Sequence, residues 1–109
     1  MNILVLHLDP RELEVLAASI ADDGHDVTAV SAPAPVPVPP DVVVVCLDAE
    51  PQRTLDLAAR IGADAQVEVA SILFVGGTQA ALKEAQRRFP TASFARLDTL
   101  RTALASMAE

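Results

Sequence analysis

The chain has 109 residues, of which 51% are apolar and 21% charged, so it is long enough for one domain with its own core and too apolar to be disordered. Its formal net charge of −7 argues against binding to nucleic acid or to an anionic membrane surface, because both require a basic patch. The one local basic cluster, Lys83, Arg87 and Arg88, is typical of a solvated helix end.

Cysteine content and the N-terminal sequence bear on the compartment. A single cysteine, Cys46, allows no internal disulfide and no multi-cysteine zinc site. The first residues, MNILVLH, lack the basic start, long apolar run and small-residue cleavage site of a signal peptide. No apolar run approaches the length of a membrane span. We therefore expect a cytoplasmic protein that is not bound to membranes.

Short apolar runs alternate with helical patterns along the chain. The expected strands are residues 3–6, 26–30, 42–47, 72–75 and 92–96, and an amphipathic helix is expected after each of them except the second. This alternation predicts an α/β fold with a doubly wound, five-stranded parallel sheet in the flavodoxin-like order 2-1-3-4-5. No repeat or domain boundary interrupts the pattern, so we expect residues 1–109 to form a single domain.

Several residues are suited to the ends of the expected helices. Asp9 is expected to cap the first helix, with Glu12 completing a capping box, and Gly24 to end that helix in the left-handed conformation. Thr78 and Asp98 are the caps expected for the last two helices.

A proline-rich segment separates the second and third expected strands. Residues 32–40 read APAPVPVPP, and five prolines in nine residues cannot form an α-helix. The segment favours an extended polyproline II conformation, so a loop replaces the second helix of the fold. Either this strap covers the sheet by itself, or it leaves an apolar surface open to a partner or to a second copy of the chain.

Three segments resemble the receiver domains of two-component response regulators. Residues 3–10 (ILVLHLDP) resemble the opening I-L-V-V-D-D-D-P of that family, residues 41–51 (DVVVVCLDAEP) its third strand, and residues 71–78 (SILFVGGT) its fourth strand. In receivers, two acids after the first strand hold a divalent cation, and an aspartate that ends the third strand accepts a phosphoryl group. A Ser or Thr after the fourth strand and a Lys after the fifth then respond to its charge.

This chain departs from the family at the positions that perform the chemistry. The metal-binding acids correspond to His7 and Leu8, while Asp9 corresponds to a third acid that does not hold the metal directly. A hard cation such as Mg²⁺ would have lost both dedicated carboxylates.

The remaining positions of the degenerate pocket differ as well. Cys46 stands at the phosphoacceptor position, with Asp48 two residues further on. Gly76 stands where receivers have the switch Ser or Thr, and Arg96 lies near the place of the lysine. The resemblance therefore implies a pseudo-receiver that is not phosphorylated, is not an enzyme and uses no metal or cofactor. It implies a regulatory module that binds unidentified protein partners or forms a homodimer.

Two other functions remain open at this point. In the first, a two-residue slip in the alignment makes Asp48 the phosphoacceptor of an atypical receiver. In the second, Cys46 and His7, which end neighbouring strands, form a small thiol or metal site. The structural alternative for this pair is a buried core cysteine beside a hydrogen-bonded histidine.

Overall fold

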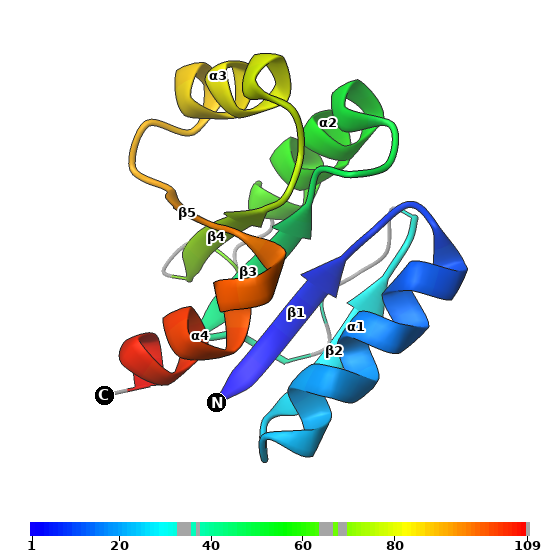
Figure 1. Ribbon diagram of the computed structural model, residues 1–109, viewed down its shortest axis with the longest axis vertical. Coiled ribbons are helices and arrows are strands. Elements are labelled where there is room, and N and C mark those ends of the chain that lie inside the picture. The colour runs from blue at the N-terminus through cyan, green and yellow to red at the C-terminus, as the bar shows by residue number, and fades with distance from the viewer. Residues whose placement is uncertain (33–35, 37, 64–66, 68–69, 109) are drawn as a thin grey trace.

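A five-stranded parallel sheet of order β2-β1-β3-β4-β5 forms the centre of the computed structural model, which describes residues 1–32, 36, 38–63, 67 and 70–108 (Figure 1). The strands are β1 (Asn2–Leu6), β2 (Asp26–Val30), β3 (Val42–Cys46), β4 (Ser71–Val75) and β5 (Ser93–Ala95). The helices are α1 (Pro10–Asp22), α2 (Pro51–Gly62), α3 (Gln79–Arg88) and α4 (Leu100–Ala108), the last preceded by the 3₁₀ turn η1 (Leu97–Thr99). The predicted flavodoxin-like fold and strand order are confirmed.

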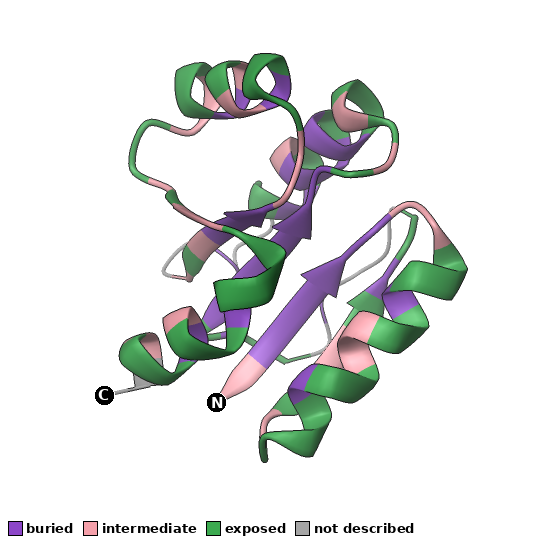
Figure 2. Cartoon of the chain, in the orientation of Figure 1, coloured by how far each residue is buried: buried purple, intermediate pink, exposed green. Residues whose placement is uncertain are grey.

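Apolar side chains on both faces of the sheet hold the helices in place. Every residue of β3 is buried, and successive valines of this strand enter opposite cores, Val43 and Val45 on one face and Val42 and Val44 on the other. Helices α2 and α3 pack on the first face, and α1 and α4 pack on the second (Figure 1). The strands are accordingly buried, whereas the helices keep exposed outer faces (Figure 2).

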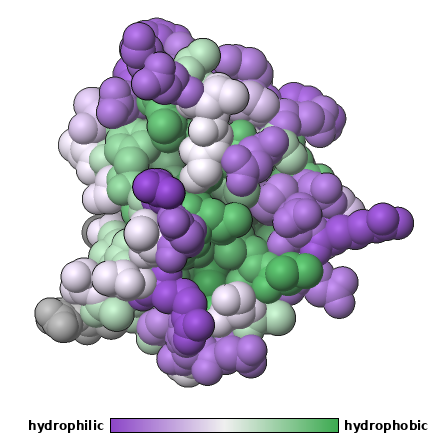
Figure 3. All heavy atoms as spheres, in the orientation of Figure 1, coloured by the Kyte–Doolittle hydropathy of each residue, from purple (hydrophilic) through white to green (hydrophobic). Residues whose placement is uncertain are grey.

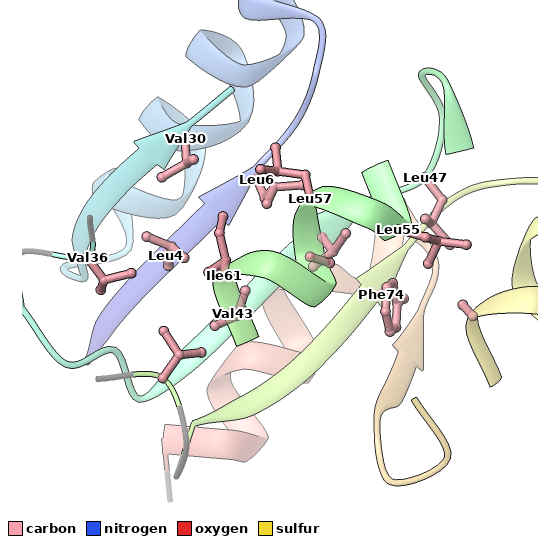
Figure 4. Close-up of a cluster of buried hydrophobic side chains, with 14 of the residues drawn as sticks. Leu4, Leu6, Val30, Val36, Val43, Leu47, Leu55, Leu57, Ile61 and Phe74 are labelled. Carbon is pink, nitrogen blue, oxygen red and sulfur yellow. The ribbon is translucent and has the colours of Figure 1, made fainter. Parts of the chain in front are cut away.

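The proline-rich segment contributes to the core that α2 covers. Val36 is buried beside Val30 and Leu4, whereas Val38 is exposed (Figure 4). The described residues between β2 and β3 form no helix, in agreement with the predicted loop, although residues 33–35 and 37 lie outside the described part. Burial of Val36 shows that the strap contributes to covering this face of the sheet, together with α2.

Two of the predicted helix ends are wrong in detail, while the others are confirmed. Asp9 caps α1 by accepting a hydrogen bond from the Arg11 N–H (3.0 Å), and Thr78 caps α3. Glu12 does not complete a capping box, because the Asp9 N–H donates instead to the ring of His7. Asp98 is not a cap either.

The start of the last helical segment explains the second error. Asp98 lies inside η1, where its carboxylate pairs with Arg96 at 3.3 Å, so the chain has already turned before the residue predicted to cap the helix.

The predicted left-handed end of α1 is found at Gly24, whose φ is +90°. Among the described residues, no helix has both the length and the apolar character needed to cross a bilayer.

The core on the α2 side predicts one large stability effect. Phe74 is fully buried, and its ring centroid lies 5.3 Å from that of Phe89 and 5.5 Å from that of Phe94. We expect Phe74→Ala to lower the free energy of unfolding by about 3–5 kcal/mol in urea denaturation, because it leaves a cavity between two other rings. The exposed Val38→Ala should change it by less than about 0.5 kcal/mol. A loss for Phe74→Ala as small as that of the control would contradict this packing.

Candidate functional site

A hollow of about 520 Å³ opens at the carboxyl ends of β1 and β3, beside α1 and η1. This is the edge at which open α/β sheets place their binding sites. Four of the residues singled out from the sequence line it, namely His7, Asp9, Cys46 and Asp48. The fold therefore brings these four residues together at one edge of the sheet.

The other three singled-out residues lie elsewhere. Leu8 is half-buried and packs against the core on the opposite face of the sheet. Gly76 and Arg96 line a second, more open hollow, which shares Asp48 and Leu97 with the first. The Arg96 side chain is exposed and pairs with Asp98. Arg96 is therefore held by its neighbour on the chain and does not project into the first hollow.

Strand register explains why His7 and Cys46 lie side by side. Leu6 of β1 pairs with Val45 of β3, so the residues that follow them stand at the same level. Side chains alternate along each strand, which puts His7 and Cys46 on the face covered by α1 and α4. Both residues line the same hollow.

His7 is almost fully buried, with 3% of its surface exposed. Its Nδ1 accepts a hydrogen bond from the Asp9 N–H at 3.0 Å. This bond assigns the ring proton to Nε2 and holds the ring at the start of α1. His7 thus has a structural duty, which is to orient the first turn of that helix.

Cys46 lies in surroundings that suppress thiolate formation. It is 2% exposed, and burial, as the main cause, raises the pKa of its thiol to about 11. The Sγ–H donates to Asp48 Oδ2 at 3.7 Å, and the nearby carboxylate adds to the upward shift. A reactive cysteine needs the opposite, an electropositive and partly exposed position that lowers its pKa.

Asp48 is exposed and joins the ends of β3 and β4. Its Oδ1 accepts a hydrogen bond from the Gly77 N–H at 2.8 Å. A Cβ atom on Gly76 would lie 2.6 Å from both carboxylate oxygens, and Gly76 has a φ of +72°. The absence of a side chain at Gly76 therefore makes room for the Asp48 carboxylate, a relation that sequence spacing did not reveal.

The two carboxylates that receivers use to hold a divalent cation are absent from this edge. The two positions that correspond to metal-binding acids hold a buried imidazole, whose Nδ1 is already hydrogen-bonded, and a leucine that points to the other face. Within the described ranges, no three His, Cys, Asp or Glu residues are grouped closely enough to hold a metal ion.

Sequence reasoning missed six of the residues that line the hollow, and three of these bear on its chemistry. Glu12 and Val15 of α1 and Leu97 of η1 all border it. The Glu12 and Val15 positions could have been found from the helical pattern, because both lie off the apolar face of α1. Leu97 had no such signal, because only the path of the chain after β5 brings it near α1.

The sequence matches no protein-family model and no curated protein, whereas the structure resembles many solved ones. The chemotaxis protein CheY4 of Vibrio cholerae is 11% identical, with a TM-score of 0.71 and 97% of each chain covered. A putative pilus assembly protein (CpaE) from Burkholderia thailandensis is 20% identical, with a TM-score of 0.69 and coverage of 99% of this chain and 98% of the other.

A response regulator signal receiver domain from Bermanella marisrubri is 16% identical over 99% of this chain and 98% of the other, with a TM-score of 0.69. Identities this low show a common fold and not a common activity. With the same strand order and nearly complete coverage, these likenesses establish that the chain has the receiver fold of response regulators.

Proposed function

We propose that this chain is a pseudo-receiver, a signalling module that binds partner proteins and is not phosphorylated. The observation that carries the proposal is the state of the two candidate acceptors. The place at the end of β3 holds a buried thiol, Cys46, and the nearest carboxylate, Asp48, is hydrogen-bonded to the turn after β4. Transfer of a phosphoryl group to a carboxylate also needs cations to neutralise the clustered oxygens, and the metal-binding acids are replaced.

The fold supports the signalling part of this proposal. Structures with the same fold include a chemotaxis protein and the signal receiver domain of a response regulator. By this analogy the chain is a regulator rather than an enzyme, working in the cytoplasm, alone or as a homodimer. The putative pilus assembly protein among its structural neighbours agrees with a role in assembling or regulating other proteins.

The first prediction concerns phosphoryl chemistry at the hollow. In an amide NMR titration with millimolar Mg²⁺ and then beryllofluoride, a phosphoryl mimic, we expect no shifts around residues 7–9, 46–48 and 76–78. The physical reason is the missing pair of metal-binding carboxylates. Labelling by a phosphodonor that Asp48→Asn abolishes and Asp56→Asn leaves intact would refute the proposal and favour the atypical phosphoacceptor. Asp56 is a suitable control because it is an exposed acid on α2 that pairs with Arg88 and does not line the hollow.

The second prediction tests whether the Asp48 carboxylate is a structural part of the turn. Gly76→Ala should lower the free energy of unfolding by about 1–3 kcal/mol, because it combines a strained positive φ with displacement of that carboxylate. The matched control, Gly62→Ala at the end of α2, has open space around the new Cβ and should be neutral or stabilising by up to ~1 kcal/mol. Equal stability of Gly76→Ala and the wild type would show that Asp48 is free of the turn.

The third prediction addresses the alternative of a thiol site. A thiol whose pKa is raised to about 11 is protonated at neutral pH, so iodoacetamide should alkylate Cys46 at least ~10-fold more slowly in the folded chain than in urea. The folded state also holds this proton more tightly than the unfolded state, whose ordinary value is 9.0. Stability should therefore fall as pH rises from about 9 toward 11, and Cys46→Ala should remove that part of the decline. Fast alkylation of Cys46 in the folded chain would support the alternative of a thiol site.

A further inference from the structure

The hollow beside β1 and β3 carries an exposed apolar wall. Val15 of α1 is 68% exposed and Leu97 of η1 is 52% exposed, and these are two of the three large hydrophobic side chains that are exposed in the described part of the chain. Both line the same hollow, together with the half-buried Leu16. Figure 3 shows apolar surface between α1 and the turn into α4, surrounded by hydrophilic residues. An exposed apolar patch with a polar rim marks an interaction surface.

The rim of this hollow is acidic. Asp9, Glu12 and Asp48 line it, and in the residues that the structure describes none of them pairs with a lysine or arginine. Their charges therefore remain available to a cation from outside. The same charge disfavours an identical surface of a second copy, because the chain carries a net charge of −7 and two acidic rims would repel each other.

A buried donor completes the site. Only 3% of the His7 surface is exposed. Its Nδ1 already accepts a hydrogen bond from the Asp9 N–H, so Nε2 carries the ring proton. Nε2 has no hydrogen-bond partner among the described residues. Among the described residues, every polar side-chain atom that is fully enclosed has a hydrogen-bond partner, so the unpaired Nε2 is not fully enclosed. Because His7 lines the hollow, this donor faces the hollow. A donor in this position can hydrogen-bond to water or to an acceptor that enters the hollow from outside.

We propose that the hollow receives a lysine or arginine side chain from an apolar segment of a partner protein. The cationic group lies against the rim carboxylates, flanking aliphatic side chains cover Val15 and Leu97, and His7 Nε2–H donates to a backbone carbonyl of the segment. This inference rests on the proposed function and names the chemistry of the partner. A volume of about 520 Å³ is sufficient for a long cationic side chain with an apolar neighbour.

The test is an NMR titration of the full ¹⁵N-labelled chain with the peptide acetyl-Ala-Leu-Lys-Leu-Ala-amide. We expect shifts confined to residues 7–9, 12–16, 46–49 and 97, the segments that border the hollow. A peptide with norleucine in place of lysine should bind at least ~5-fold more weakly, because it keeps the aliphatic stem and loses the charge. Binding should also weaken as the salt concentration rises.

Two variants on the hollow have matched controls outside it. Glu12→Gln should weaken peptide binding about 2–5-fold, whereas Glu14→Gln on the same helix should leave it unchanged. Leu97→Ser should weaken it about 3–10-fold, whereas Val38→Ser, at the third exposed hydrophobic residue, should not. All four positions are exposed, so the variants are expected to fold, and their amide spectra provide the check.

Four outcomes of the titrations would overturn the inference. They are equal binding of the norleucine peptide, shifts that map to another surface, equal binding of n-butylamine in place of the peptide, and no shifts at about 5 mM peptide, a weak affinity limit. A dimer in light scattering that Leu97→Ser dissociates would identify a second copy as the occupant and also overturn it. If the peptide does not bind and beryllofluoride causes no shifts around the hollow, only this inference is overturned. Phosphodonor labelling of Asp48 removes the proposed function whatever the peptide does.

Discussion

The parallel pairing of β3 with β1 and β4 is the constraint on which the rest of the structure depends. Because all three strands are buried on both faces, their register is fixed by apolar side chains that cannot exchange faces without exposing the core. Their carboxyl ends consequently meet at one edge. His7, Cys46 and Gly76 come from different parts of the chain and lie at this edge for this reason.

At that edge the side chains satisfy one another. His7 accepts the backbone N–H of Asp9, Cys46 donates to Asp48, and Asp48 accepts the N–H of Gly77. In an active receiver the corresponding groups must be available to a metal ion and a phosphoryl group. Here most of their hydrogen-bonding capacity is used within the protein, which is the physical basis for proposing that the module signals by binding. The acidic rim has no cationic partner among the described residues, and with the exposed Val15 and Leu97 and the second nitrogen of His7 it forms the proposed recognition surface.

Part of the site was accessible to sequence reasoning. The positions of His7, Cys46 and Asp48 follow from counting along buried strands, since parallel strands bring their carboxyl ends together. The failures concern residues whose role depends on contacts across the chain. Glu12 was assigned to a capping box because its spacing fits one, but a side chain from the end of β1 already occupies the donor. No sequence pattern indicated the structural role of Asp48, because its partner, the turn after β4, lies 29 residues away.

The sequence by itself determined the alternation of strands and helices, the strand order, the absence of acids at the two positions where receivers have them, and the replacement of one helix by a proline-rich segment. These are properties of short windows, where apolar periodicity and the geometry of proline act locally. Only the tertiary structure decided that Val36 joins the core, that Gly76 leaves space for the Asp48 carboxylate, and that Leu97 stands opposite α1. The reason is that burial, close approach and unpaired charge depend on distances between segments remote in sequence, which no local pattern encodes.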